Sequence, residues 1–387
     1  MRVAALVLIM APIAMIAIAY VGYPLLLALV ALFRPRRPQL PDPLEWPTIS
    51  LTVPAYNAQA SIRQTLESLL RLEYPVDRRQ IVVISDASTD DTDTIARSYA
   101  SRGVEVVRLP ERRGKTAAEN AAGAVVRGDI VVNIDATVRI PPESLKRLVR
   151  VFQDSTVGVA SGRDVSTSGD GMQSTRGESG YVGFEMWVRS LETRLDSIVG
   201  ASGCFYGIRR RLYDAHFPEH LSRDFASALI AKENGLRAVS VNDAVCEVPR
   251  TPSLGLEIQR KTRTMARGLE TLWYKRHLMN PFRYGGFAFM LIGHKLCRWL
   301  VYPWLPAAVV GLVMLSLDSR VGAGLLAIAG IAVALGVAGM RWRKGRTPAV
   351  LAVPGFILAA NLAGVLAWIK VLRHEASPIW EPTRRPA

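Results

Sequence analysis

The sequence predicts an α/β domain, built on a Rossmann-like nucleotide-binding sheet, that is attached to transmembrane helices. Two observations support this fold class. Apolar residues gather in residues 3–33 and 299–372 of the 387-residue chain, in runs long enough to cross a membrane. From residue 48 onward, short β-branched runs alternate with helical stretches, which is typical of a parallel sheet.

The first apolar run, Val3 to Phe33, is predicted to be an uncleaved anchor, because it is too long for a signal peptide and lacks a small-residue cleavage site. One arginine precedes it, and Arg34, Arg36 and Arg37 follow it. Since Lys and Arg favour the cytoplasmic side, the domain that follows is expected in the cytoplasm. We therefore expect an anchor and basic linker in residues 1–47 and a cytoplasmic domain in residues 48–285.

Residues 286–372 are expected to form an interfacial helix and about three transmembrane helices. His294, Lys295 and Arg298 interrupt the apolar pattern, and an ionised side chain costs about 2.5–3.5 kcal/mol at a bilayer centre. The interfacial helix is therefore placed at 287–298, and the spans at 299–317, 321–340 and 350–369.

Four spans in all would leave the tail, residues 373–387, outside, although its basic residues favour the inside. The segment between the last two spans is also basic and contains Arg341, Arg343, Lys344 and Arg346. Either the charge rule fails at the tail, or the segment around Pro354 does not cross fully.

In the middle region a strand and a helix alternate four times. Strands are expected near 49–57, 81–88, 104–109 and 129–136, with helices near 60–72, 91–101, from 115, and 142–152. Ligands of such sheets bind beyond the carboxyl ends of the strands. The residues found there are Pro54, Tyr56, Asn57, Asp86, Gly114, Lys115 and Asp135. Each alone could be a turn, cap or solvated residue, but their recurrence predicts one nucleotide-binding crevice.

Several other kinds of site are excluded or disfavoured. The chain has neither a glycine-rich dinucleotide fingerprint nor a P-loop, so the loop "RRGKT" and a divalent ion on Asp135 are expected to hold phosphates. The net charge of +15 gathers beside apolar segments, which indicates membrane topology rather than nucleic-acid binding. The three cysteines are far apart and predict neither a disulfide framework nor a metal site.

The stretches "VPAYNAQASIRQTLESLL", "VVISDASTDDT", "RRGKTAAEN" and "NIDAT" resemble, in order and spacing, inverting family 2 glycosyltransferases with the GT-A fold. The similarity continues through "GASGCFYGIRRRLY", "SRDFASALIAKENGLRAV" and "EIQRKTRTMARG", over about residues 48–270. The flanking spans are like those of membrane-bound bacterial members. The resemblance implies a nucleotide-sugar donor, and we expect a UDP-sugar.

In that family, residues matching Tyr56 and Asp86 hold the nucleobase, and the residue matching Asp135 lies near the diphosphate and a Mg²⁺ or Mn²⁺ ion. Thr137 stands where the family's D-x-D motif has its second carboxylate. Because Mg²⁺ commonly binds through one or two carboxylates plus phosphates and waters, Asp135 alone can suffice.

The family's catalytic base matches Asp224, which takes the proton of the acceptor hydroxyl. Arg223 replaces the acid that usually precedes this aspartate, and we expect it to lower the pKa of Asp224 and keep it ionised. The alternative is a plain helix N-terminal residue.

The segment "QRKTR" resembles the Q-x-x-R-W element, so Gln259, Arg260 and Arg263 are expected over the diphosphate. Thr264 replaces the tryptophan of processive synthases, which argues against processive polymerisation. A basic amphipathic helix on anionic lipid is the alternative reading. Glu185, Trp187 and Gly203 are interpreted as the acceptor side, although a packed helix followed by a turn fits equally well.

The resulting hypothesis is transfer of a sugar to a lipid-linked or polysaccharide acceptor, at the cytoplasmic face of the bacterial inner membrane, in cell-envelope or exopolysaccharide synthesis. The expected partners are the donor, the acceptor, membrane lipids and export components, with no nucleic acid. Two alternatives remain open: a polyprenyl-phosphate sugar transferase, and a catalytically silent scaffold of polysaccharide export. Thr137, Arg223 and Thr264 favour the scaffold.

Overall fold

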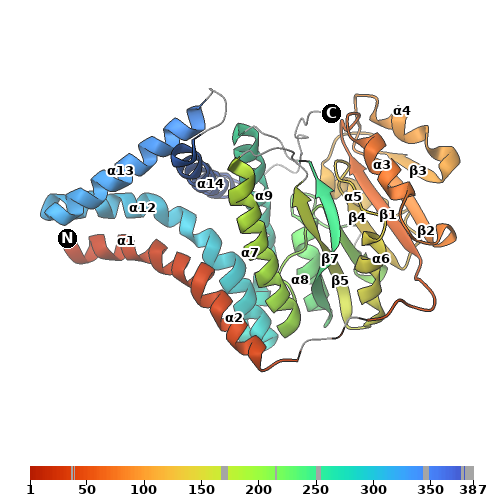
Figure 1. Cartoon of the computed structure of the whole chain (residues 1–387), viewed down its shortest axis with the longest axis horizontal. Helices are drawn as coiled ribbons and strands as arrows, with labels where there is room; N and C mark the ends of the chain where they lie inside the picture. The colour runs from red at the N-terminus through yellow and green to blue at the C-terminus, as the bar shows by residue number, and fades with distance from the viewer. Residues whose placement is uncertain are drawn as a thin grey trace. The chain divides into compact units, whose positions relative to one another are not determined.

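The computed structural model describes residues 1–35, 38, 40–166, 173–213, 216–249, 254–342, 348–375 and 379. It divides into two compact units (Figure 1). The sheet unit comprises residues 34–168, 185–251 and 377–387, and the helical unit comprises residues 1–33, 169–184 and 252–376. Several basic residues used to predict topology lie outside the described residues, namely Arg36, Arg37, Arg343, Lys344, Arg346 and those of the tail beyond 375.

The sheet unit contains a seven-stranded sheet with the strand order β3-β2-β1-β4-β6-β5-β7. Its strands are β1 (Ile49–Ala55), β2 (Arg79–Ser85), β3 (Val104–Arg108), β4 (Ile130–Ile134), β5 (Val157–Ser166), β6 (Phe205–Arg209) and β7 (Arg237–Val248). Strands β1 to β4 are parallel, as predicted. Strand β6 runs antiparallel to both β4 and β5, so the complete sheet is mixed.

Helices cover both faces of this sheet. They are α3 (Ile62–Leu70), α4 (Thr92–Arg97), α5 (Lys115–Ala122), α6 (Ser144–Arg150), α7 (Gln173–Leu195, shared with the helical unit) and α8 (Arg223–Glu233). One core joins α3 and α6 to the sheet, and a second joins α5 and α8 to it. The second core uses small side chains, including Ala118, Ala122, Ala228 and Ala231. Helices α5 and α8 therefore pack closely against the strands.

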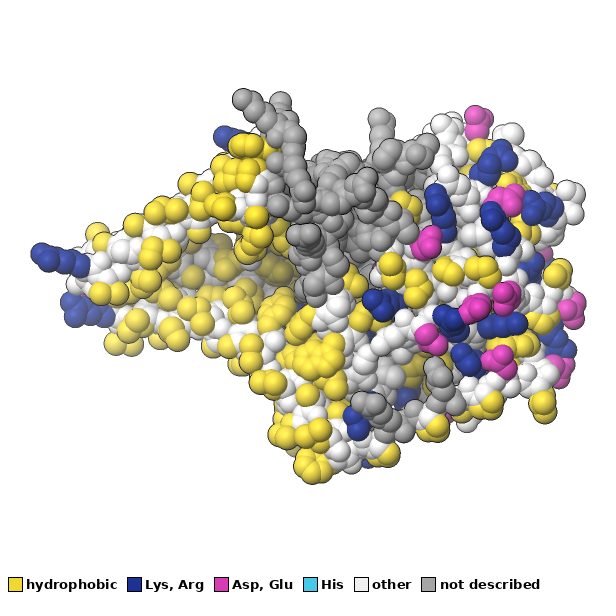
Figure 2. Space-filling view, in the orientation of Figure 1, with side chains coloured by type: hydrophobic (Ala, Val, Ile, Leu, Met, Phe, Trp, Pro, Cys, Tyr) yellow, Lys and Arg dark blue, Asp and Glu magenta, His cyan; other side chains and the backbone are white. Residues whose placement is uncertain are grey.

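The helical unit holds four helical segments long and apolar enough to cross a membrane, as predicted, within the described residues. They are Arg2–Leu32 (31 residues), Gly286–Asp318 (33), Arg320–Arg341 (22) and Ala349–Leu372 (24). The first comprises α1 (Arg2–Ala17), a π-helical turn (Ile18–Gly22) and α2 (Tyr23–Leu32). On the face shown in Figure 2, hydrophobic side chains cover these helices, whereas charged side chains gather over the sheet unit.

The segment Gly286–Asp318 joins the predicted interfacial helix and the following span into one continuous helix. It consists of α11 (Gly286–Leu291), a π-helical turn (Ile292–Leu296) and α12 (Cys297–Asp318). The third and fourth segments are α13 (Arg320–Arg341) and α14 (Ala349–Leu372), and α14 continues through Pro354 without a break.

Helix α9 (Leu254–Tyr274) belongs to the same unit and is followed by the short helix α10 (Pro281–Tyr284). One face of α9, formed by Thr262, Ala266 and Leu269, is buried. The Thr262 hydroxyl donates a hydrogen bond to the carbonyl of Ala363 in α14 at 3.3 Å. Helix α9 therefore packs its buried face on a membrane-length helix.

Candidate active site

The loop that leads into helix α5 is held by the end of strand β2. The Asp86 carboxylate accepts hydrogen bonds from the backbone amides of Arg113 and Gly114, each at 2.8 Å. Gly114 has a φ of 101°, a conformation that favours glycine because other residues would place Cβ against the backbone. The carboxylate after β2 thus fixes the position at which Lys115 begins its helix.

Tyr56 and Asn57 lie at the same edge of the sheet. The guanidinium of Arg112 stacks over the Tyr56 ring, 3.8 Å from its centroid. Asn57 donates to the Thr89 hydroxyl at 3.1 Å and accepts from the Thr89 amide at 2.8 Å, which ties the ends of β1 and β2 together. Pro54, also predicted to bind the donor, is buried within β1.

Lys115 links the ends of β4 and β6. Its ammonium donates to Asp135 Oδ1 at 2.6 Å and to the carbonyl of Gly203 at 2.8 Å. The Asp135 amide also donates to the carbonyl of Cys204 at 3.2 Å. Because β6 runs antiparallel to β4, the residues that precede β6 lie beside the residue that follows β4.

Asp224, on helix α8, lies next to Gly203. A Cβ added to Gly203 would lie 2.5 Å from Asp224 Oδ2, so the carboxylate passes directly over the glycine. The Ser222 hydroxyl donates to Asp224 Oδ1 and orients it. The structure therefore brings Lys115, Asp135, Gly203 and Asp224 together, and we call these four residues the Lys115 cluster.

Charge in the Lys115 cluster is concentrated and partly shielded from solvent. The side chains of Lys115 and Asp135 are 22% and 31% exposed. Burial on its own lowers the pKa of the Lys115 ammonium, but the carboxylates of Asp135, Glu119 and Asp224 outweigh it and raise that pKa. Lys115 is therefore a cation at neutral pH.

Comparison with known proteins identifies the part of the chain that holds Lys115, Asp135 and Gly203. The sequence profile described as glycosyl transferase family 2 matches residues 50–217. The chain contains a family 2 glycosyltransferase domain. A mannosyltransferase from Pyrobaculum calidifontis, solved in complex with GDP-Man and Mn²⁺, is 26% identical with a TM-score of 0.71, covering 95% of this chain and 99% of that one. The predicted GT-A fold, a mixed α/β sheet accompanied by membrane-length helices, is thereby confirmed.

Two curated relatives match shorter regions. A beta-monoglucosyldiacylglycerol synthase from Nostoc sp. is 27% identical over 190 residues, which are 48% of this chain and 41% of the synthase. An N-acetylglucosaminyltransferase from Rhizobium sp. is 24% identical over 238 residues, which are 56% of this chain and 52% of that enzyme. The chain thus spans about half, or less, of the curated relatives it matches.

In the family 2 domain, the arginine next to Asp224 faces the interior. Arg223 is 4% exposed, and its guanidinium donates to Asn120 Oδ1 and lies 4.6 Å from the centroid of the Tyr213 ring. Its Nε is 3.9 Å from an oxygen of Glu119 on helix α5. Glu119 was not predicted as a site residue, because an acid within an alanine-rich helix is typical of a solvated surface position.

Asp164, near the end of β5, is a second residue that was not predicted from the sequence. Its Oδ1 accepts a hydrogen bond from the Ser202 hydroxyl at 2.6 Å and one from the Cys246 thiol at 3.3 Å. The Ser202 amide donates to the Ser161 hydroxyl at 2.8 Å. These bonds fix the loop that contains Gly203.

The remaining predicted site residues lie on helices α7 and α9. Glu185 and Trp187 are on the part of α7 that belongs to the sheet unit, and the Trp187 side chain is 44% exposed. Gln259, Arg260 and Arg263 are on helix α9 of the helical unit, where Arg260 donates to Glu257 at 2.9 and 2.7 Å. Their predicted roles at the acceptor and the diphosphate stay predictions.

The oxygen ligands at the Lys115 cluster suit a hard cation that shares its coordination with substrate. Over the described ranges, no three His, Cys, Asp or Glu residues form a group able to hold a metal ion. Asp135 offers one carboxylate, and Mg²⁺ in phosphate sites commonly takes its other ligands from phosphates and waters. Asp135 therefore fits a divalent cation that arrives with a diphosphate.

Proposed function

We propose that this protein transfers a sugar, with inversion, from a nucleoside diphosphate sugar to a lipid-linked or polysaccharide acceptor at a membrane surface. The observation that supports this most strongly is the Lys115 cluster, in which a carboxylate on α8 and a cation paired with the acid after β4 meet around Gly203. This arrangement places a base and a charge-stabilising group on the same small region of a family 2 domain.

The chemistry assigns each group of the cluster a role. Asp224 accepts the proton of the acceptor hydroxyl while the hydroxyl oxygen forms a bond to the anomeric carbon. The bond between that carbon and the diphosphate breaks, and the nucleoside diphosphate leaves with the electron pair. Lys115 offsets the negative charge that develops on the leaving oxygen. A divalent cation on Asp135, when bound, would add Lewis-acid stabilisation of the same charge.

Two nucleotides, UDP and GDP, are candidates for the donor. The sequence favours a UDP-sugar through the family resemblance. The mannosyltransferase that matches nearly the whole chain was solved with GDP-Man, which supports a GDP-sugar. A donor panel should therefore contain both nucleotides.

A lipid is the favoured acceptor. The chain has four helical segments of membrane-spanning length among its described residues, and one relative is named for the synthesis of a glycosylated diacylglycerol. We propose a multi-pass location in the bacterial inner membrane, with the family 2 domain in the cytoplasm, in cell-envelope or exopolysaccharide synthesis.

The test uses the full chain in native membranes with UDP- and GDP-sugars and Mg²⁺ or Mn²⁺. Mass analysis of the lipid and polymer fractions identifies the product. We expect turnover of one donor and, for Asp224→Asn, a loss of at least about 100-fold, within the range for removal of a general base. Asp196→Asn is the matched control, because Asp196 pairs with Lys232 at the far end of α8.

Two outcomes would replace this proposal. Normal turnover by Asp224→Asn with polyprenyl phosphate would support a polyprenyl-phosphate sugar transferase, whose acceptor needs little deprotonation. Calorimetry in which neither nucleotide-sugars nor Mn²⁺ bind would support a silent scaffold.

A further inference from the structure

A buried pair of opposite charges lies directly behind the Lys115 cluster, and the proposed chemistry does not use it. We propose that Glu119 and Arg223 are positioning residues, whose ion pair sets the first turn of helix α8 and thereby the place of Asp224 relative to Lys115. This inference rests on the proposed function, since it assigns Asp224 the role of base.

Glu119 lies between two cations that serve different parts of the site. The Glu119 side chain is 2% exposed, with Oε1 3.9 Å from Lys115 Nζ and Oε2 3.9 Å from Arg223 Nε. Lys115 holds Asp135, and Arg223 is the residue next to Asp224. A single carboxylate therefore connects the donor side of the site to the helix that presents the base.

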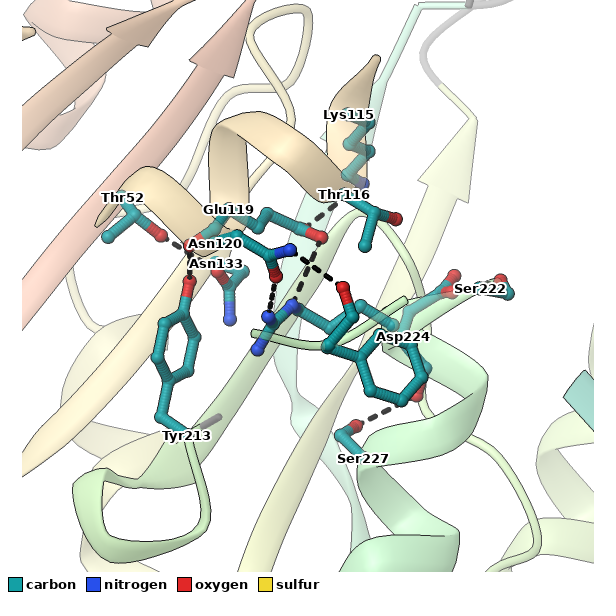
Figure 3. A network of polar contacts seen from close by, with 12 residues as sticks. Thr52, Lys115, Thr116, Glu119, Asn120, Asn133, Tyr213, Ser222, Asp224 and Ser227 are labelled. Atoms are coloured by element: carbon teal, nitrogen blue, oxygen red, sulfur yellow. Dashed lines mark hydrogen bonds and ion pairs between the residues drawn. The ribbon is translucent and has the colours of Figure 1, made fainter. Parts of the chain in front are cut away.

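The segment that leads into α8 is attached to helix α5 by further bonds. The backbone carbonyl of Leu221 accepts a hydrogen bond from the Thr116 hydroxyl at 3.0 Å, and that of Phe217 accepts one from the side-chain amide of Asn120 at 2.7 Å. The Tyr213 hydroxyl donates to the backbone carbonyl of Glu119 at 2.6 Å (Figure 3). Thr116 and Asn120 are four positions apart, so their side chains share one face of α5.

Because Arg223 and Asp224 are consecutive residues of α8, the position of the Arg223 side chain also sets the position of the Asp224 carboxylate. Consecutive residues of a helix point about 100° apart, since a turn holds about 3.6 residues. Arg223 points to the interior, while Asp224 points to Gly203. A shift of the buried guanidinium therefore rotates or moves the carboxylate.

The pair also explains how an arginine can stand at position 223. The family resemblance puts an acid before the catalytic aspartate, whereas this chain buries a cation there. A buried charge without a counter-ion is strongly unfavourable. Glu119 supplies the opposite charge from the neighbouring helix, so the two residues are expected to act as a unit.

The test is a double-mutant cycle with Glu119→Gln, Arg223→Gln and the double variant, measured as kcat and donor KM on the full chain. We expect each single variant to lower kcat by about tenfold or more, because a misplacement of the base by a fraction of an ångström slows the chemical step. Donor KM should change less than kcat. The double variant should be no slower than the slower single variant, because coupled residues are not additive.

Lys232→Gln is the matched control. It removes the ion pair of Lys232 with Asp196, 2.6 Å long, from the other end of the same helix. This variant should keep wild-type kcat. Should the single Gln variants fail to fold, the double variant Glu119→Leu/Arg223→Leu replaces the pair with apolar side chains and is expected to fold but to keep the low kcat.

Hydrogen exchange separates failure of this inference from failure of the proposed function, because it needs no turnover. The Ala226 amide donates to the Ser222 carbonyl at 2.9 Å and reports the first turn of α8. Exchange there should be faster in Glu119→Gln and Arg223→Gln, and unchanged in Lys232→Gln. Unchanged exchange in Glu119→Gln would overturn the positioning role even if no donor is turned over. Faster exchange with wild-type kcat, or additive losses in the double variant, would overturn it as well.

Discussion

Replacing Gly203 by alanine tests the geometry of the Lys115 cluster with one methyl group. The new Cβ would lie 2.5 Å from Asp224 Oδ2, whereas an ordinary contact is at least 3.4 Å. The carboxylate oxygen must therefore retreat by about 0.9 Å, and it can do so because it is the end of a side chain. We expect the variant to fold, and kcat to fall by about 10- to 100-fold, since a 1 Å misplacement can cost 100-fold.

The assay compares kcat and donor KM for Gly203→Ala with those of the wild type and of Gly330→Ala. Gly330 in α13 has no atom within 4 Å of an added Cβ, so it controls for the methyl group itself. Donor KM should stay near the wild-type value if the displaced oxygen serves the acceptor. Wild-type kcat in a folded Gly203→Ala protein would refute the assignment of Asp224 as the base.

Three further predictions concern charge. Lys115→Met should lower kcat and raise donor KM by about tenfold or more each, because it removes the cation that offsets the charge of the diphosphate. Steady-state kinetics with the preferred donor measures both constants, and unchanged values would exclude this role of Lys115. Dialysis against EDTA should abolish turnover and Mn²⁺ or Mg²⁺ should restore it, as followed by nucleoside diphosphate release, whereas turnover that resists EDTA would argue against a divalent cation at Asp135. Hydrogen bonds from Arg102 and Tyr99 lower the pKa of Glu67, so its ionised form stabilises the fold above the ordinary pKa of 4.5 and loses this effect as the pH falls through the lowered value. Glu67→Gln should thus be less thermally stable than wild type near neutral pH. The difference in unfolding temperature, measured by calorimetry, should narrow as the pH falls below the lowered pKa of Glu67. A difference that does not change with pH would contradict the coupling between the ionisation of Glu67 and stability.

The parallel part of the sheet could be predicted because its signals are local. Each of strands β1 to β4 is a short apolar run followed by a helical pattern, and the structure has them within a few residues of the predicted positions. Strands β5, β6 and β7 form their sheet pairs with partners that are distant in sequence. Their direction depends on long-range pairing, which no local pattern reveals.

The same distinction applies to the site. Asp86, Lys115 and Asp135 could be found because polar residues at the ends of buried strands stand out in the sequence. Glu119 could not be assigned in this way, because an acid in an alanine-rich helix looks like a solvated surface residue. Only the packing of α8 on α5 buries it and gives it Arg223 as a partner.

Four consecutive residues, Arg112 to Lys115, connect the two ends of the proposed donor site. Arg112 stacks on Tyr56, and the backbone amides of Arg113 and Gly114 donate to Asp86. This end of the site is expected to hold the nucleobase. Lys115 donates to Asp135, at the end expected to hold the diphosphate. Because these contacts belong to one short loop, a nucleobase that fits poorly would also shift the Lys115 ammonium. Discrimination between nucleotides should therefore appear in kcat as well as in KM, since the misplaced cation would stabilise the departing diphosphate less.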